Sequence, residues 1–462
     1  MPDEAKIPKG RIRRSAKLGS IIGTQGARYA GTKAANVARS EEDSKQALEA
    51  RHLETAMKMV GALGQMKGAA MKLGQFASFI DTEFIPEEYR EIYQEQLGKL
   101  RNEAPAMPWE QVVKVLEEEY DGEPLSEYFA EIEHEAFAAA SIGQVHRATT
   151  RDGDEVVVKV QYPGVAEAVE TDLRNAMMLL PLVKRLAPGL DVKALAAELR
   201  ERITEELDYE LEAQNQRTLA RIYRGHPFIV IPDVITSLSH ERMMVSEYVH
   251  GTGFEELKHR GQAERDRIGE MIFRFYFGCL YRHGQFSGDP HPGNSMLLDD
   301  GRMAFLDFGL FKRMPPGAVE LEIGVARAII EGDTDRIMQL GTDVGFFSDP
   351  DKFNPDRVLA HFRAATSWYT CDREVTLTPE YATQVMIDMS DPRSEYFGYL
   401  RQESAPPDHI FGRRMEVLTL AVIAQLHATG NFNRIAREWF YEDPPATELG
   451  RAEAAFYGQP VA

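Results

Sequence analysis

Gly288-Asp289-Pro290-His291-Pro292-Gly293-Asn294 is the stretch that decides the fold, and Asp307-Phe308-Gly309 follows it after a short β-like run. Asn294 stands five positions after Asp289, and Asp307 stands thirteen positions after Asn294. Magnesium takes hard oxygen ligands, of which usually only one or two come from protein. Transfer of a phosphoryl group from a nucleotide needs such a metal and a carboxylate near the attacking oxygen. We therefore interpret Asn294 and Asp307 as magnesium ligands and Asp289 as the catalytic base.

The combination of the two motifs is more specific than either motif alone. An Asp-Phe-Gly triplet recurs by chance, whereas both motifs at this spacing are typical of the lower half of a kinase active site. The alternative is a pair of polar turns that flank a hairpin. The spacing favours the kinase interpretation.

A strand that carries a lysine is expected upstream of these motifs. Glu155–Gln161 is a β-branched run that contains Lys159, and a turn at Asp152-Gly153 joins it to the strand-like residues 141–148. In kinases such a lysine contacts the nucleotide phosphates and pairs with a carboxylate. Many strands also carry a lysine that only faces solvent. Upstream of Asp289, Asn294 and Asp307, we interpret Lys159 as a phosphate contact.

The carboxylate partner of Lys159 is open on spacing alone. Glu167 and Glu170 follow it closely in the sequence. The acidic run Glu206-Leu207-Asp208-Tyr209-Glu210-Leu211-Glu212 follows about fifty positions later. Acidic residues so dense on one helix are usually a solvated face.

Ala138-Ala139-Ala140-Ser141 occupies the place where a kinase has its glycine-rich loop. Alanine is small, but it restricts the backbone and disfavours the left-handed geometry that glycine permits. We expect a nucleotide to fit there with its phosphates held differently; the alternative is a helix start or a packing surface. Glu247 and Val249, at the end of the strand-like Met243–Glu247, complete the predicted nucleotide contacts.

Composition narrows the class of protein. The chain has 462 residues, of which 43% are hydrophobic and 27% charged, and its formal net charge is −20. The acidic balance argues against nucleic-acid binding, which needs clustered Lys and Arg. Only Cys279 and Cys371 occur, in no metal-type spacing, and no apolar run reaches the ~18–20 residues that cross a bilayer. We expect a cytoplasmic protein of two or three domains with no transmembrane segment.

The pattern along the chain predicts five segments. They are a flexible basic leader (1–40), a helical extension (41–125), a strand-rich lobe with inserted helices (126–250), a helical lobe with the catalytic stretch (251–440) and a loose tail (441–462). Strands are also expected at 229–231, 234–237, 296–298 and 303–306, and long helices at 165–186 and 192–223. The leader is either a solvated tail or a peripheral contact with an anionic membrane.

Four motifs together resemble the UbiB/AarF family of atypical kinases, which includes the mitochondrial ADCK proteins. They are Lys72-Leu73-Gly74-Gln75, Ala138-Ala139-Ala140-Ser141, the pair Glu206 and Asp208, and Asp289-Pro290-His291-Pro292-Gly293-Asn294. The resemblance covers roughly residues 40–345. It implies an α+β, two-lobed, protein-kinase-like fold that is mostly helical, with an N-terminal helical extension packed over the active site.

The resemblance also implies roles for the residues of the extension. Lys72 and Gln75 would reach into the nucleotide site, with Gly74 as a structural residue of the same motif. Glu206 and Asp208 would tie the extension to the kinase core. Among the open candidates for the partner of Lys159, the resemblance implies Glu212.

The function that the resemblance implies is binding of ATP or ADP with Mg²⁺. ATP hydrolysis, or phosphorylation of a small or lipid-like acceptor, would follow, with a link to ubiquinone and isoprenoid-lipid metabolism. The alternatives are a nucleotide-gated binding or chaperone-like module for an apolar metabolite and, less favoured, an ordinary protein kinase.

The sequence after Asp307-Phe308-Gly309 argues against an extended protein substrate. The chain reaches Met314-Pro315-Pro316 and turns at once into the helix-like residues 320–330. No long activation segment and no Ala-Pro-Glu motif follow to form a peptide platform. A small acceptor therefore fits this pattern better.

Overall fold

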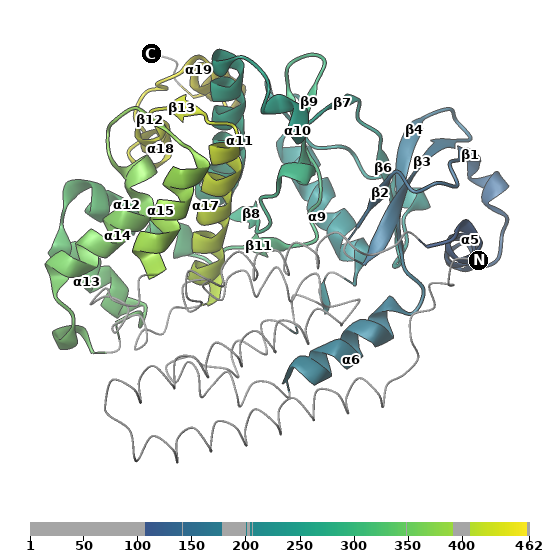
Figure 1. Cartoon of the computed structure of the whole chain (residues 1–462), viewed down its shortest axis with the longest axis horizontal. Coiled ribbons are helices and arrows are strands. Elements are labelled where there is room, and N and C mark those ends of the chain that lie inside the picture. Colours follow the sequence, from purple (N-terminus) through teal and green to yellow (C-terminus); the bar gives the residue numbers. More distant parts are fainter. Residues whose placement is uncertain are drawn as a thin grey trace, which may run out of the picture. The chain divides into compact units, whose positions relative to one another are not determined.

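The structure is a computed structural model that describes residues 107–140, 142–177, 200, 204–205, 207–347, 349–390 and 407–459. It divides into two compact units (Figure 1). The first unit is Met1–Asp208 with His240–Met244, and the second is Tyr209–Ser239 with Val245–Ala462. The predicted leader and helical extension lie outside the described residues, apart from the stretch that begins at Met107.

An antiparallel sheet organises the first unit. The sheet has the order β1-β3-β4-β6, and β2 pairs with β3 as well. The bounds are β1 (Phe129–Ile132), β2 (Ala138–Ala139), β3 (Gly143–Thr150), β4 (Glu155–Gln161) and β6 (Met243–Glu247), of which Met243 and Met244 belong to this unit. Three helices accompany it: α5 (Trp109–Glu119), the 3₁₀ helix η2 (Leu125–Glu127) and α6 (Val165–Met177).

The β3–β4 hairpin is confirmed as predicted. Lys159 pairs with Val145 across the two strands, and Gly153 in the connecting turn has a φ of 92°. Val156 and Val158 are buried and alternate with more exposed side chains, as a strand with one covered face requires.

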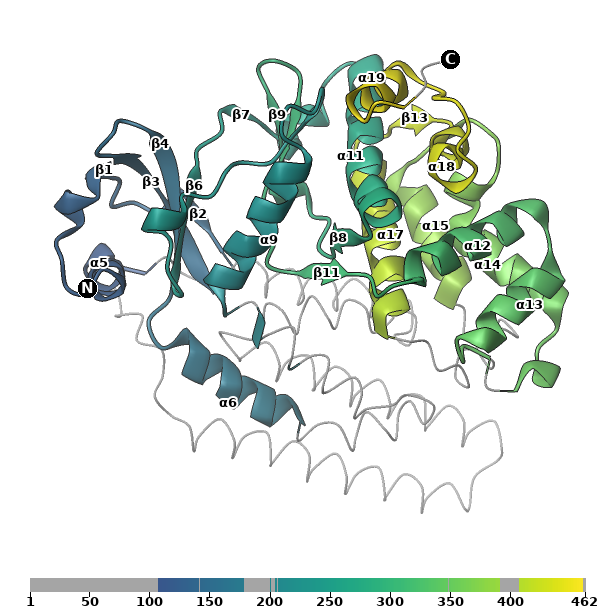
Figure 2. The same ribbon diagram turned by 180° about the vertical axis from the view of Figure 1, so that it is seen from behind.

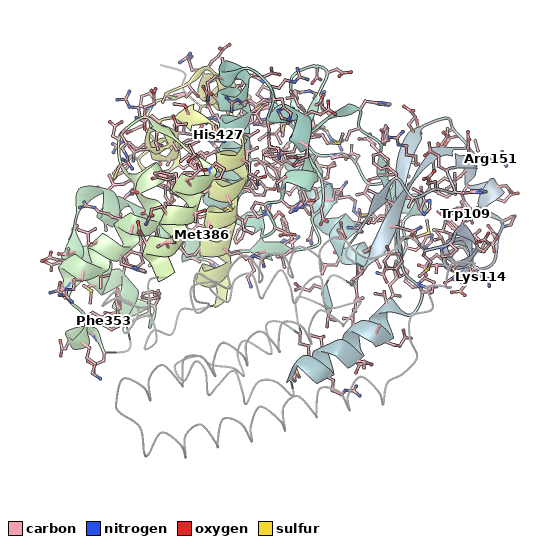
Figure 3. All side chains as sticks on the ribbon, viewed as in Figure 1. Trp109, Lys114, Arg151, Phe353, Met386 and His427 are labelled. Carbon is pink, nitrogen blue, oxygen red and sulfur yellow. The ribbon has the colours of Figure 1, made fainter. Side chains whose placement is uncertain are left out.

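The described part of the segment predicted as helical, 41–125, begins with the helix α5. In α5, Val112, Val115 and Leu116 are buried. Trp109, labelled in Figure 3, stacks on His134 with ring centroids 4.5 Å apart. These contacts fix α5 within the first unit.

Short strands in the second unit position the loops between its helices. One sheet has the order β5-β10-β9-β7, and β8 and β11 form a separate antiparallel pair. The bounds are β5 (Ile229–Val230), β7 (Gly251–Gly253), β8 (Gln285–Ser287), β9 (Ser295–Leu298), β10 (Met303–Phe305), β11 (Phe311–Arg313), β12 (Val375–Thr376) and β13 (Thr429–Gly430). The strands predicted beside the catalytic stretch therefore form.

Helices make up most of the second unit (Figure 2). They are α9 (Tyr209–Ile222), α10 (Phe254–Leu257), α11 (Gln262–His283), α12 (Ala318–Glu331), α13 (Thr334–Asp343), α14 (Pro355–Thr370), α15 (Pro379–Ser390), α17 (Pro407–Gln425), α18 (Phe432–Phe440) and α19 (Glu448–Phe456). Short 3₁₀ helices are η3 (Thr236–Leu238), η4 (Pro292–Asn294) and η5 (Pro350–Lys352). None of the described helices is long and apolar enough to span a membrane.

The core of the second unit forms around α11, with α17 beside it (Figures 1 and 2). Every residue from 271 to 281 of α11 is buried. Phe273 packs edge-on against Trp368 and Phe432, which come from α14 and α18. The helix ends at Gly284, whose φ of 62° is the left-handed geometry that favours glycine. The chain then enters β8 and the catalytic stretch.

Three sequence predictions differ from the structure. Residues 234–237, predicted as a strand, give one isolated bridge at Val234 and the 3₁₀ helix η3. The predicted helix 192–223 is not continuous, because Leu207 and Asp208 are non-helical and α9 begins at Tyr209. The expected loose tail contains α19, which the side chain of Thr447 caps.

The helix α19 has a physical reason to be ordered. Leu449 and Glu453 are buried, and Glu453 makes a 2.8 Å ion pair with the buried Arg274 of α11. No local sequence pattern predicts this long-range contact. The periodicity of the last residues therefore gave no sign of it.

Candidate active site

The two sequence motifs adjoin one pair of strands. The catalytic stretch follows β8, and the Asp-Phe-Gly motif precedes β11. Ser287 at the end of β8 pairs with Phe311 at the start of β11. The backbone N–H of Gly288 then donates a 2.8 Å hydrogen bond to the carbonyl oxygen of Leu310. The catalytic stretch and the Asp-Phe-Gly motif are therefore neighbours in space at this point.

The catalytic stretch is a tight loop held by its own polar groups. The side chain of His291 caps η4, because its Nδ1 accepts a 3.0 Å hydrogen bond from the N–H of Gly293. The Asn294 Nδ2 donates to the backbone carbonyl of Asp289 at 3.3 Å. Asp289 and Asn294 are thus directly connected.

The β9–β10 pair places Asn294 next to Asp307. Ser295 pairs with Phe305, and the N–H of Leu306 donates a 2.8 Å hydrogen bond to the carbonyl oxygen of Asn294. Asp307 is the next residue and has a φ of 67°. A left-handed backbone at a residue other than glycine is uncommon and often marks a functional site.

The helix α9 brings Glu212 to the Asp-Phe-Gly motif. A Cβ atom added to Gly309 would lie 3.4 Å from Glu212 Oε2 and 3.5 Å from Asp307 Oδ1. Glu212 is 3% exposed, and Asp307 Oδ1 accepts a 3.1 Å hydrogen bond from the N–H of Gly309. Two carboxylates therefore flank Gly309.

A second residue of α9 holds the centre of the motif. The Nδ2 of Asn215 donates to the carbonyl oxygen of Phe308 at 3.3 Å, and the Phe308 side chain is buried. Arg313 donates to Asn215 Oδ1 at 3.4 Å. The backbone of the motif is thus held by Asn215 of α9, and Arg313 of β11 in turn bonds the Asn215 side chain.

The buried phenol of Tyr276, on α11, has a pKa that is affected by both carboxylates of the candidate site. Burial raises the pKa of its phenol well above the usual value, and the charges of Asp289, Cys279 and Asp307 raise it further. Asp289 and Asp307 therefore both raise the pKa of the same buried phenol.

Arg414 contacts the candidate site, and sequence reasoning missed it. Its Nη2 lies 3.4 Å from Oδ1 of Asp289, and it comes from α17, 125 positions further along the chain. No motif surrounds it. The available signal was the pair of adjacent arginines, Arg413-Arg414, shortly before the mostly apolar residues 417–424.

In the first unit, two of the predicted phosphate-binding residues, Ala138 and Lys159, share a row of the sheet. Ala138 pairs with Val145, and Val145 pairs with Lys159. Directly opposed residues project from the same face of a sheet. The N–H of Ala140 donates a 2.9 Å hydrogen bond to the carbonyl of Gly143. The alanine segment is therefore a strand at this point, whereas a helix start was the alternative.

The open candidates for the partner of Lys159 differ in their surroundings. Glu170 makes a 2.8 Å exposed ion pair with Arg174, and Glu167 lies in the first turn of α6. Glu212 is buried beside Gly309 in the second unit. Pairing of Lys159 with Glu212 stays a prediction.

The remaining predicted residues fall in several places. Glu247 Oε2 accepts a 2.9 Å hydrogen bond from the N–H of Asp233, and Val249 lies half-buried in the segment between β6 and β7. Asp208 is exposed directly before α9. Lys72, Gly74, Gln75, Ser141 and Glu206 lie outside the described residues.

The residues of the site fit magnesium. Within the described ranges, no group of three or more His, Cys, Asp or Glu is placed to hold a metal ion. Asn294, directly before β9, and Asp307, directly after Leu306 at the end of the β9–β10 pair, instead offer one amide and one carboxylate oxygen. That donor set suits magnesium, which keeps several waters and shares its other ligands with substrate phosphates.

Three features of this chain are typical of kinase-like proteins. They are the lysine-bearing strand, the catalytic stretch and the Asp-Phe-Gly motif. The family model described as "ABC1 atypical kinase-like domain" matches residues 99–341. The chain belongs to this family of atypical kinases, which confirms the resemblance to UbiB/AarF proteins and the predicted α+β kinase-like fold.

Relatives of known name or structure agree with this family. The chain is 31% identical to "Atypical kinase COQ8B, mitochondrial" of Rattus norvegicus over 75% of this chain and 65% of that protein. It is 29% identical to "Atypical kinase coq-8, mitochondrial" of Caenorhabditis elegans over 63% of this chain and 39% of that protein. The chain therefore spans less than two thirds of the length of these curated relatives.

A solved structure is also similar. The complex of Rv3197 with erythromycin from Mycobacterium tuberculosis has 31% sequence identity and a TM-score of 0.63. The similarity covers 88% of this chain and all of that chain. The fold of that solved structure is therefore shared over most of this sequence.

Proposed function

We propose that this protein is an atypical kinase or ATPase that binds ATP or ADP with Mg²⁺. The observation that carries the proposal is the adjacency of Asn294 and Asp307, fixed by the hydrogen bond from Leu306 to Asn294. Family membership supports the same activity. In this proposal Asn294 and Asp307 hold the metal, which when bound neutralises charge on the nucleotide phosphates.

In this proposal, the side chains of the protein accept one proton and hold the nucleotide phosphates in place. A water or hydroxyl oxygen attacks the terminal phosphorus, and Asp289 takes its proton. The new P–O bond forms as the bond to the bridging oxygen breaks, and its electron pair leaves with the nucleoside diphosphate. Lys159, with Glu212 as its proposed partner, contacts the phosphates.

The proposed nucleotide contacts include the alanine segment and the β6–β7 connection. These are Ala138, Ala139, Ala140, Ser141, Glu247 and Val249, with Lys72 and Gln75 from the extension. Glu206, Asp208 and Gly74 are proposed to position that extension. The row formed by Ala138, Val145 and Lys159 supports the first of these contacts.

The acceptor is proposed to be small or lipid-like. From Gly309 the chain passes through β11 and enters α12 at Ala318, so that only a short segment separates the motif from a helix. A peptide platform needs a longer activation segment. The family resemblance makes quinone or isoprenoid-lipid metabolism the proposed setting.

Nucleotide turnover tests the proposal. Wild type should release phosphate from ATP with magnesium and lose this activity when EDTA removes the metal. Asp289→Asn should lower kcat by about 100-fold or more, because a general base contributes about 10²–10⁴. Asp299→Asn is the matched control, because Asp299 is exposed on the turn between β9 and β10. Equal turnover by wild type and Asp289→Asn would contradict the proposed base.

A second candidate function is nucleotide-gated binding of an apolar metabolite with little catalysis. The complex of Rv3197 with erythromycin favours it, since that relative is shown with a small-molecule ligand. Complementation of a deletion strain separates the two functions. If Asp289→Ala restores growth while Lys159→Ala does not, nucleotide binding is the required activity; if both fail, catalysis is required.

Peripheral membrane contact is proposed for the basic leader, residues 1–40. This segment contains nine Lys and Arg residues, and its only acidic residues are Asp3 and Glu4. Basic segments are attracted to anionic lipid surfaces. Co-sedimentation with phosphatidylserine vesicles should drop when residues 1–40 are deleted, and an unchanged bound fraction would exclude this role.

A further inference from the structure

The helix α17 carries two adjacent arginines, Arg413 and Arg414, with different surroundings. Successive residues of a helix point about 100° apart. Arg414 lies beyond residues 99–341, which the family model matches. Its function is therefore not given by the family motif.

Arg413 fixes α17 in the core. Its Nη1 donates to Glu416 Oε2 at 2.8 Å and to the Tyr369 hydroxyl at 3.3 Å, and its Nη2 bonds Glu322 of α12. The Tyr281 hydroxyl of α11 donates to Glu416 at 3.1 Å. These bonds tie α17 to α11, α12 and α14. The direction of the next side chain is therefore fixed as well.

That next side chain, Arg414, reaches the catalytic stretch. Its Nη2 lies 3.4 Å from Asp289 Oδ1, and the two side chains are 8% and 18% exposed. Asn294 meanwhile binds the backbone carbonyl of Asp289 at 3.3 Å. Asp289 is thus held at its backbone by one side chain and at its carboxylate by another.

The burial of Arg414 needs an explanation. Removal of a guanidinium from water is costly unless a carboxylate or other acceptors compensate it. Charge-assisted bonds of arginine also fix the orientation of the carboxylate that they meet. A carboxylate that must face an attacking oxygen gains from such orientation, because small misplacements slow a reaction strongly.

We propose that Arg414 is a positioning residue that holds the carboxylate of Asp289 in the orientation needed for proton transfer. The proposal rests on the proposed function, in which Asp289 is the base. Arg414 acts through Asp289, so it should affect turnover and leave nucleotide affinity alone. It extends the active site to α17, outside the segment that carries the family motifs.

Steady-state kinetics of the full chain test this role. Arg414→Gln should lower kcat for magnesium-ATP about tenfold and change KM less than about twofold. Arg414→Lys keeps the charge without the planar fork, so its kcat should lie between wild type and Arg414→Gln. Arg434→Gln is the matched control, because Arg434 bonds the exposed Asp372 at 2.9 Å. Its kcat should equal that of wild type.

Chemical rescue distinguishes a positioning role of Arg414 from a purely structural one. Millimolar guanidinium, far below the molar range that unfolds proteins, should restore part of the kcat lost in Arg414→Ala. It should not restore Arg413→Ala, in which the helix anchor is lost. In Asp289→Asn, the further change Arg414→Gln should cost little, because residues that act as one unit are not additive.

Several results would overturn the proposal. One is an Arg414→Gln variant with the kcat of wild type. Another is an Arg414→Gln variant in which only KM rises. A third is an equal additional loss in the presence and absence of the Asp289 carboxylate. An inactive wild type would instead refute the proposed function, and the role of Arg414 would fall with it.

Discussion

The backbone N–H of Leu306 donates a 2.8 Å hydrogen bond to the backbone carbonyl oxygen of Asn294. This single bond continues the β9–β10 ladder by one step beyond Ser295 and Phe305. It brings the residue before Asp307 against Asn294, although the two motifs are separated in sequence by a hairpin. The spacing of the motifs thus has a structural cause, since the hairpin length sets which residues meet.

Gly309→Ala should weaken magnesium-dependent nucleotide binding with little effect on folding. The added Cβ would lie 3.4 Å from Glu212 Oε2 and 3.5 Å from Asp307 Oδ1, which is ordinary contact without a clash. The methyl group would take up space beside both carboxylates. We expect nucleotide affinity to fall about tenfold, within the range for groups that support metal ligands, as measured by calorimetric titration.

Gly261→Ala is the control for this change. No heavy atom lies within 4 Å of a Cβ added at Gly261, which precedes α11. Its nucleotide affinity should match wild type. The same affinity in Gly309→Ala and wild type would show that the space beside Glu212 and Asp307 is not used.

Arg274→Met should destabilise the second unit strongly. Arg274 is fully buried and pairs with Glu270 at 2.7 Å and with Glu438 and Glu453 at 2.8 Å. Methionine would fill similar volume but leave three carboxylates without their cation. Breaking a buried pair costs about 3–5 kcal/mol of unfolding free energy, which urea unfolding measures.

An exposed ion pair provides the comparison for Arg274. Arg224 pairs with Asp233 at 3.0 Å, with side chains 68% and 48% exposed. Arg224→Met should cost less than about 1 kcal/mol. Losses of similar size for Arg224→Met and Arg274→Met would mean that the buried network contributes no special stability.

Acid should destabilise the second unit through His283. Burial, with the charge of Arg282, lowers the pKa of His283 to about 4. In the unfolded chain its pKa is about 6.5, so below that pH the unfolded state takes up a proton that the folded state does not. Stability is therefore highest above pH 6.5 and falls as the pH drops towards 4. Between pH 7 and pH 5 the loss should reach about 2 kcal/mol.

The variant His283→Gln should lose part of this pH dependence in urea unfolding at pH 7 and pH 5. His259→Gln is the control, because His259 is exposed, and it should keep the wild-type dependence. The neighbouring His226, whose pKa burial also lowers, leaves a residual slope in His283→Gln. A wild-type slope in His283→Gln would contradict the role of His283.

Local sequence patterns were sufficient for the elements that satisfy local rules. The β3–β4 hairpin follows from β-branched residues on either side of Asp152-Gly153, and Gly153 adopts the positive φ that such a turn needs. The β9–β10 hairpin and the adjacency of its two flanking motifs were predictable for the same reason. Strand pairing across a short turn leaves few alternatives.

Tertiary contacts decided what local patterns missed. Spacing alone leaves Glu167, Glu170 and Glu212 open as partners of Lys159, and the position of Glu212 beside Gly309 comes from tertiary packing. Arg414 reaches Asp289 from a helix 125 positions away. The C-terminal helix α19 depends on the buried pair of Glu453 with Arg274. None of these contacts has a local signature.

The magnesium dependence of nucleotide stabilisation tests the central claim that Asn294 and Asp307 hold one metal. A ligand that binds only the folded state raises the melting temperature. ATP with magnesium should raise it in wild type and in Asp299→Asn, and ATP with EDTA should raise it less. Asp307→Asn is suited to the test because asparagine also tolerates a left-handed backbone. We predict that Asp307→Asn loses the magnesium-dependent rise; the same rise as in wild type would contradict the account.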